Sequence, residues 1–95
     1  MDCEKVIIIK RDGAKEKFSI EKIKRAITKA YRAGGILNED NTIEQIAIQA
    51  ASSISGTEIS VEEIQDIVEK ELMIRNPYIA KKYIIYREWR SEERR

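Results

Sequence analysis

Two adjacent cations at a tight turn are the residues of this chain whose types and spacing could do chemistry. Lys10 and Arg11 follow an apolar stretch and precede Asp12-Gly13, a pair that suits the positive φ angles of a hairpin turn. The returning segment meets a helix start at Ser19, and Lys22 lies in the first turn of that helix. Helix N-termini attract anions, as do ammonium and guanidinium groups. We therefore expect Lys10, Arg11 and Lys22 to converge on a phosphate group.

Other interpretations of these cations are simpler. Lys and Arg at strand ends commonly keep sheet edges soluble, which is the favoured interpretation for the pair taken alone. The Walker A pattern of P-loop hydrolases is absent from the sequence.

There is no histidine, and no serine or cysteine stands beside an evident base, so we expect a domain that is not an enzyme. Cys3 is the only cysteine, which excludes an internal disulfide and a Cys/His zinc site.

Length and charge restrict the class further. The 95 residues suffice for a single domain, residues 1–95, with a real core. The chain has 18 Lys and Arg against 17 Asp and Glu, a net charge of +1 that lacks the basic excess of a general nucleic-acid binder. No segment looks like a signal peptide or approaches the length of a membrane helix. We therefore expect a cytoplasmic protein with no membrane partner.

The periodicity of apolar residues predicts an α+β fold, a four-helix bundle-like domain covered by a small antiparallel β-sheet. The sheet would consist of an N-terminal hairpin, with strands near residues 5–10 and 15–18, and a short third strand near residues 57–59. Phe18 and Ile23 would form a hydrophobic staple at the start of the first helix, which would end at residues 33–35. Such a fold is mostly helical.

Capping signals predict the other three helices. A capping box at residues 42–45 would open the second helix, and Gly56 would end it. A second capping box at residues 60–63 would open the third, with Ile59 and Ile64 as its staple. Asn76 would close the third helix, and Pro77 would begin the last one, which runs to about residue 89.

Basic residues repeat along the first helix. Lys22, Arg25, Lys29 and Arg32 form a stripe that we interpret as a solvated face, with only Lys22 in the anion site. Ile64, Tyr83 and Tyr86 have helical spacing and are core residues on residue type, although they could also contact a ligand.

Three segments together resemble the ATP-cone domain. They are residues 6–22 with the Lys-Arg-Asp-Gly turn, residues 60–69 and residues 83–87, so the similarity spans nearly the whole chain. The resemblance implies an allosteric module that binds ATP or dATP, usually at the N-terminus of ribonucleotide reductases and in a related transcriptional repressor. It implies a stand-alone cone or a piece of a longer protein, with a reductase favoured over the repressor.

The resemblance also implies a set of nucleotide-binding residues. Lys10 and Arg11 would meet the phosphates with Lys22, residues 16–22 would wrap the nucleotide, and the third and fourth helices would line the base and sugar. The implied residues are Ile8, Lys10, Arg11, Glu16, Lys17, Phe18, Ser19, Lys22, Val61, Ile64, Gln65, Tyr86 and Arg90. Lys81, Lys82 or Arg87 could replace Arg90 as the cation. The family often has Asn or Asp at the position of Ser19 and His at that of Gln65.

The expected ligand is therefore ATP or dATP, with Mg²⁺ accompanying the nucleotide, and the expected partners are a reductase catalytic domain or a second copy of the chain. Two alternatives remain open: a small helical nucleic-acid module that uses the basic stripe and the last helix, and an interaction domain that docks without ligand. The acidic third helix, with Glu62, Glu63, Asp66 and Glu69, counts against nucleic acid.

Overall fold

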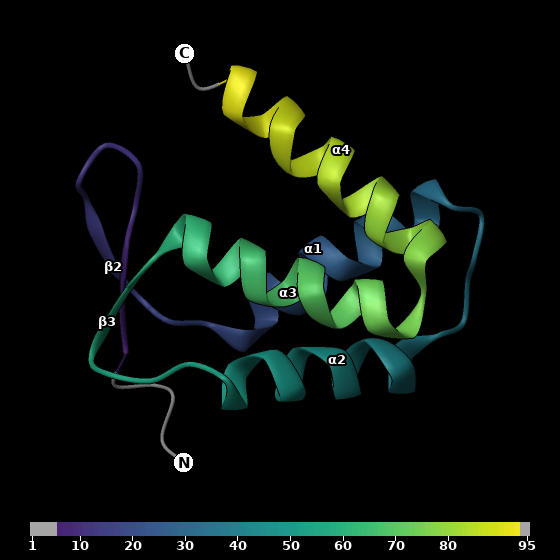
Figure 1. The fold of residues 1–95 in the computed structure, drawn as a ribbon, viewed down its shortest axis with the longest axis horizontal. Helices are drawn as coiled ribbons and strands as arrows, with labels where there is room; N and C mark the ends of the chain where they lie inside the picture. The colour runs from purple at the N-terminus through teal and green to yellow at the C-terminus, as the bar shows by residue number, and fades with distance from the viewer. Residues whose placement is uncertain (1–5, 94–95) are drawn as a thin grey trace.

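Four helices and a three-stranded sheet make up the fold. The computed structural model describes residues 6–93, with side chains for residues 6–87. The elements are β1 (Ile7–Ile9), β2 (Lys15–Lys17), α1 (Ile20–Ala33), α2 (Asp40–Ser52), β3 (Glu58–Ser60), α3 (Val61–Arg75) and α4 (Pro77–Glu93). The strands gather at one end of the molecule, and the helices extend away from them (Figure 1). Helix α1 packs on α2 and α4, and α3 packs on the same two helices. The predicted α+β class is confirmed.

The sheet is mixed, so the antiparallel sheet expected from the sequence is only partly right. Strands β1 and β2 form the predicted antiparallel hairpin, in which Ile8 pairs with Glu16. Strand β3 adds to the other edge of β1 in parallel, with Ile59 opposite Ile8. The reason is the connection: α1 and α2 carry the chain back to the start of β1, so β3 leaves in the direction of β1.

The second helix has boundaries that differ from the expected ones. It begins at Asp40 and ends at Ser52, so neither the capping box at Thr42 nor termination at Gly56 is correct. The Ile43 amide donates to the Glu39 carbonyl at 2.9 Å, and the Thr42 hydroxyl donates to the Glu39 carboxylate at 3.0 Å. Thr42 lies inside the first turn and donates its hydroxyl hydrogen to Glu39, so Thr42 is not the N-cap residue of this helix.

The ends of the other helices follow the sequence signals, with two exceptions: the cap of α1, and the end of α4, which runs to Glu93 and not to about residue 89. The Ser60 hydroxyl accepts a hydrogen bond from the Glu63 amide at 3.1 Å, which is the predicted cap of α3. Pro77 is the first residue of α4, and the side-chain oxygen of Asn76 accepts from the Ile79 amide at 3.3 Å. Ser19 stands at the N-cap position of α1, but its hydroxyl accepts no capping hydrogen bond. The first turn of α1 therefore has no side-chain cap.

The core lies among the helices and on one side of the sheet. Ile27, Ile46, Leu72 and Ile79 are completely inaccessible to solvent, one from each helix. Phe18 and Ile23 are both buried, as the predicted staple requires.

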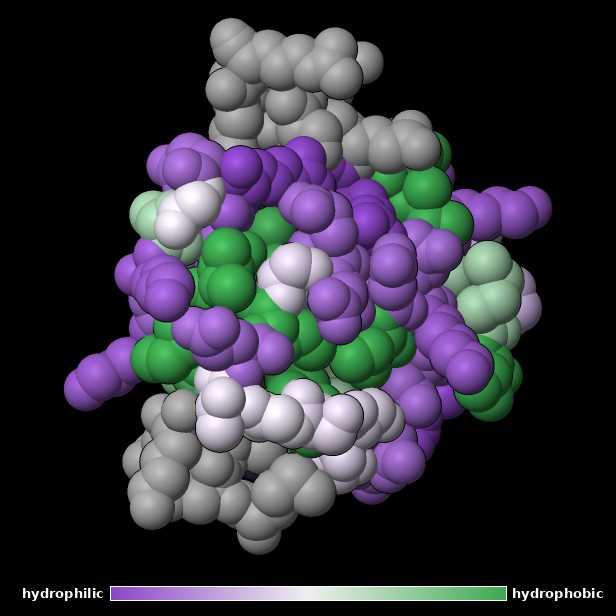
Figure 2. Space-filling view, turned by 60° about the vertical axis from the view of Figure 1, so that its left-hand side comes forward, coloured by the Kyte–Doolittle hydropathy of each residue, from purple (hydrophilic) through white to green (hydrophobic). Residues whose placement is uncertain are grey.

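Among the described residues, no polar or charged side chain is buried, and no helix is long and apolar enough to cross a membrane. Polar side chains cover much of the surface at the sheet end, with apolar atoms visible between them (Figure 2).

Gly34, directly after α1, is a site of close packing. A Cβ atom there would lie 2.6 Å from Ile79 Cδ1 and 3.0 Å from Tyr78 Cε2. The backbone φ of Gly34 is −84°, so a side chain would be excluded by contact alone. Because Ile79 is fully buried, its Cδ1 atom can move away only by disturbing the core, and we expect Gly34→Ala to lower the free energy of unfolding by about 1–3 kcal/mol. Urea denaturation measures this, and a midpoint equal to that of the wild type would contradict the packing described.

Candidate functional site

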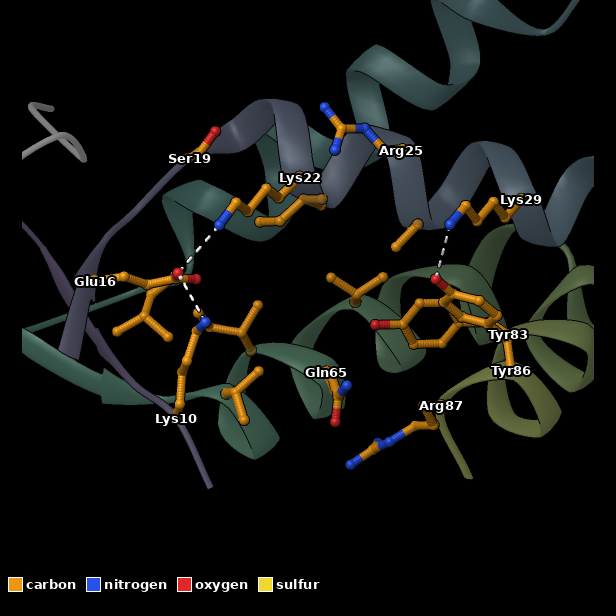
Figure 3. Close-up of a pocket in the computed structure, with 16 residues that line it drawn as sticks. Lys10, Glu16, Ser19, Lys22, Arg25, Lys29, Gln65, Tyr83, Tyr86 and Arg87 are labelled. Atoms are coloured by element: carbon orange, nitrogen blue, oxygen red, sulfur yellow. Dashed lines mark hydrogen bonds and ion pairs between the residues drawn. The ribbon is translucent and has the colours of Figure 1, made fainter. Parts of the chain in front are cut away.

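A cavity opens between the hairpin and α1 on one side and α3 and α4 on the other (Figure 3). Its volume of about 520 Å³ lies in the range of ligand pockets. Cationic, aromatic and apolar side chains together form its wall. The lining residues are Ile8, Lys10, Glu16, Ser19, Lys22, Ile23, Arg25, Ala26, Lys29, Val61, Ile64, Gln65, Val68, Tyr83, Tyr86 and Arg87.

Two lysines from different elements meet at the hairpin end of the cavity. Lys10, just after β1, and Lys22, in the first turns of α1, place their ammonium groups 3.3 Å and 3.1 Å from the same oxygen of Glu16 (Figure 3). The hydrogen bond from Lys22 lowers the pKa of Glu16; burial opposes this shift, and Lys10 adds to it. The carboxylate therefore stays charged and marks a point where an anion is held by two cations.

Arg11 does not join these lysines, so the expected convergence of three cations is wrong for this residue. Its Nε lies 2.8 Å from a carboxylate oxygen of Glu62, and its Nη2 donates to the Gln65 side-chain oxygen at 3.1 Å. Both partners belong to the first turns of α3: Glu62 holds the guanidinium by opposite charge, and Gln65 holds it by a hydrogen bond. Arg11 thus ties the hairpin turn to α3 and is not among the lining residues.

The basic stripe of α1 contributes more to the cavity than the sequence indicated. Arg25 and Lys29 line the cavity together with Lys22, and only Arg32 lies outside it. Both side chains are exposed, as expected of a solvated stripe, but the expectation that only Lys22 lies at the cavity is wrong for them. The physical reason is that α4 lies across α1 here: the Lys29 ammonium donates to the Tyr86 hydroxyl at 3.3 Å.

The interior of the cavity is apolar. Ile23 and Ala26 from α1 face Ile64 and Val68 from α3, and all but the half-buried Ala26 are buried. Tyr83 closes this part from α4. At the α4 side, Arg87 binds Asp66 at 2.8 Å and Glu69 at 3.0 Å, which joins α4 to α3. The cavity therefore combines an apolar wall with a cationic rim, an arrangement that suits a flat apolar group attached to an anion.

The structure brings together most of the residues implied by the sequence resemblance. Nine line the cavity: Ile8, Lys10, Glu16, Ser19, Lys22, Val61, Ile64, Gln65 and Tyr86. Phe18 is buried in the core, Lys17 is exposed on β2, and neither is among the lining residues. The side chain of Arg90 lies outside the described residues.

Sequence reasoning missed several lining residues, for which a signal existed. Arg25, Ala26 and Lys29 follow Lys22 at three, four and seven positions, which is one face of a helix. Tyr83 was expected mainly in the core, and Arg87 was expected only as a possible replacement for the cation Arg90. Both line the cavity. Within the described residues, no group of three His, Cys, Asp or Glu side chains could hold a metal ion.

The fold and this cavity are those of a small nucleotide-binding regulatory domain. The family model of the ATP cone domain matches residues 6–92, and the chain belongs to this family. ATP-cone domains bind ATP or dATP and serve as regulatory modules. The resemblance expected from the hairpin turn and the last two helices is thereby confirmed.

Several reductases contain a segment similar to this chain. It is 42% identical over 100 residues to the ribonucleoside-diphosphate reductase subunit alpha of Chlamydia pneumoniae, covering 94% of the chain and 10% of that protein. It is 35% identical over 89 residues to the anaerobic ribonucleoside-triphosphate reductase of Salmonella typhimurium, covering 92% and 12%. For the vitamin B12-dependent ribonucleoside-diphosphate reductase of Thermoplasma acidophilum, identity is 38% over 92 residues, covering 87% and 12%. The chain thus spans about a tenth of the length of these relatives.

Proposed function

We propose that the cavity binds ATP or dATP, with the phosphates at the hairpin end and the base in the apolar interior. The observation that carries this proposal is the meeting of Lys10 and Lys22 on one carboxylate oxygen of Glu16. A phosphate oxygen would replace that carboxylate as the shared acceptor and carry more negative charge. The first turn of α1, which lacks a side-chain cap, adds unpaired backbone donors beside Ser19.

The apolar interior supports a position for the base. Ile64 and Val68 on α3 and Ile23 on α1 offer buried surface on which a flat ring would pack. Gln65 and Tyr86 supply polar groups at the border between this interior and the rim. Among the described residues that line the cavity, Glu16 is the only carboxylate, so a Mg²⁺ ion that accompanies the nucleotide would be held mainly by its phosphates.

The proposed regulation acts on a ribonucleotide reductase. The relatives that carry this domain are reductases, and the chain corresponds to about a tenth of each. We propose that nucleotide binding alters how the domain docks on a reductase catalytic domain or on a second copy of itself. Because the cavity joins the hairpin to three helices, a bound nucleotide would change the relative positions of these elements.

Calorimetric titration and thermal melting with different nucleotides test the adenine specificity. At a concentration of 100 times the dissociation constant, ATP or dATP should stabilise the domain by about 2.7 kcal/mol. GTP and CTP should give smaller shifts, and each titration is run with and without Mg²⁺. Equal and negligible shifts for all four nucleotides would contradict the proposal.

Arg25 allows a matched test of the phosphate end. Its side chain is exposed at the cavity and has no hydrogen-bond or ion-pair partner among the described residues, so an anion could bind it without breaking an existing contact. We expect Arg25→Gln to weaken ATP binding about 3- to 10-fold. Arg32→Gln, on the same helix but outside the cavity, is the control and should leave the affinity unchanged. If the two variants bound ATP with equal affinity, Arg25 would not contact the phosphates.

A further inference from the structure

Tyr83 is a buried residue whose polar atom faces the cavity. It lies on α4, and only 3% of the residue is exposed. In Figure 3 its ring extends from α4 and its hydroxyl points toward the middle of the cavity. Within residues 6–87, no side chain or backbone group forms a hydrogen bond with this hydroxyl. Tyr86, one turn further on, differs because its hydroxyl accepts from Lys29.

A hydroxyl shut off from water without a partner costs free energy, and no side-chain nitrogen or oxygen of the described residues is in that position. The Tyr83 hydroxyl is therefore open to the cavity, where a ligand can take the place of water. The Tyr83 ring packs in the core, and a phenylalanine ring would fill the same space. The hydroxyl is the part of the side chain that this packing does not explain. Burial raises the pKa of Tyr83 well above its ordinary value, so the hydroxyl keeps its proton and can both donate and accept.

The surroundings of the hydroxyl indicate which part of a ligand it would meet. Tyr83 enters the cavity from the α4 side, whereas the converging lysines lie at the hairpin end (Figure 3). The apolar side chains of Ile64 and Val68 line the same cavity. We infer that the Tyr83 hydroxyl forms a hydrogen bond with the base of the bound nucleotide and so acts as a specificity-determining residue. This inference rests on the proposed binding of adenine nucleotide in the cavity.

The test compares a ligand that has a base with one that does not. Tyr83→Phe should weaken ATP binding about 5- to 20-fold, because one hydrogen bond to the base is lost. The affinity for inorganic tripolyphosphate should not change, because that probe has no base. The melting temperature without ligand should stay the same or rise, since the hydroxyl has no partner in the free domain.

Tyr78→Phe is the control. Tyr78 also lies on α4, but it is outside the cavity and donates to the Gly34 carbonyl at 3.4 Å. This variant should bind ATP as the wild type does. The inference on Tyr83 would be overturned if Tyr83→Phe bound ATP with wild-type affinity, or if it lost ATP and tripolyphosphate equally. If the wild-type domain binds GTP as tightly as ATP, the proposed function is wrong whatever Tyr83→Phe does. If the wild type binds neither ATP nor tripolyphosphate, both the proposed function and the inference on Tyr83 are wrong.

Discussion

Replacement of Lys22 by alanine should remove most of the stabilisation that ATP gives to the domain. Lys22 and Lys10 share one oxygen of Glu16, so Lys22 supplies one of the two ammonium groups that meet at the proposed phosphate position. The loss of a charged hydrogen bond would weaken binding about 10- to 100-fold. At a fixed ATP concentration that stabilises the wild type by about 2.7 kcal/mol, the variant should then gain only about 1.4 to 0.4 kcal/mol.

Thermal melting with and without ATP measures this difference, and Lys70→Ala is the control. Lys70 is an exposed lysine of α3 outside the cavity, and it has no ion-pair partner among the described residues. Its replacement changes the net charge equally and should leave the ATP effect intact. In the absence of ligand, Lys22→Ala should cost at most about 1 kcal/mol, because its pair with Glu16 is partly exposed. An identical ATP effect in both variants would contradict the phosphate position.

Leu72→Ala should have the largest effect on the stability of the fold. Leu72 lies on α3, is completely buried and belongs to the core shared by all four helices. Its truncation removes apolar contacts and leaves a void, so we expect the free energy of unfolding to fall by about 2–5 kcal/mol. For a domain with a total stability of about 5–15 kcal/mol, this is a substantial fraction.

The same variant tests whether ligand binding and folding are linked. Leu72 is not a lining residue, so the cavity should survive wherever the variant folds. ATP at 100 times its dissociation constant should then restore about 2.7 kcal/mol. Ile74→Ala, two residues along α3 with its side chain exposed, should change the stability by less than about 0.5 kcal/mol. Urea denaturation of both variants provides the comparison, and a Leu72→Ala domain that ATP does not stabilise would argue against binding to the folded cavity.

Local signals predicted the elements of this fold well where the chemistry is confined to neighbouring residues. The Asp12-Gly13 turn, the Ser60 cap and Pro77 each act within one turn of backbone, and the structure follows all three. The direction of β3 depends instead on how α1 and α2 return the chain, which no local pattern encodes. The predicted start of α2 was wrong for a different, local reason: Glu39 stands before the helix, and Thr42 donates to it from within the first turn.

Predictions for the site divide in the same way, between contacts set by nearby residues and contacts set by the tertiary fold. Hairpin geometry and helix spacing were enough to bring Lys10 close to Lys22. The partner of Arg11 could not be predicted, since Glu62 and Gln65 are more than fifty residues away and approach it only through the tertiary fold. Arg25 and Lys29 are exposed, as a basic stripe predicts, and they also line the cavity because α4 lies beside α1, which the spacing of the basic residues does not encode.

An NMR titration of the isotopically labelled domain with ATP locates the bound nucleotide without assuming which residues contact it. If the nucleotide occupies the cavity, we expect shift changes at the hairpin, at α1 from Ser19 to Lys29, at α3 from Val61 to Val68, and at α4 around Tyr83 and Arg87. The exposed face of α2, which contributes no lining residue, should not respond. Saturable shifts centred on α2, or no shifts at millimolar ATP, would contradict binding in the cavity.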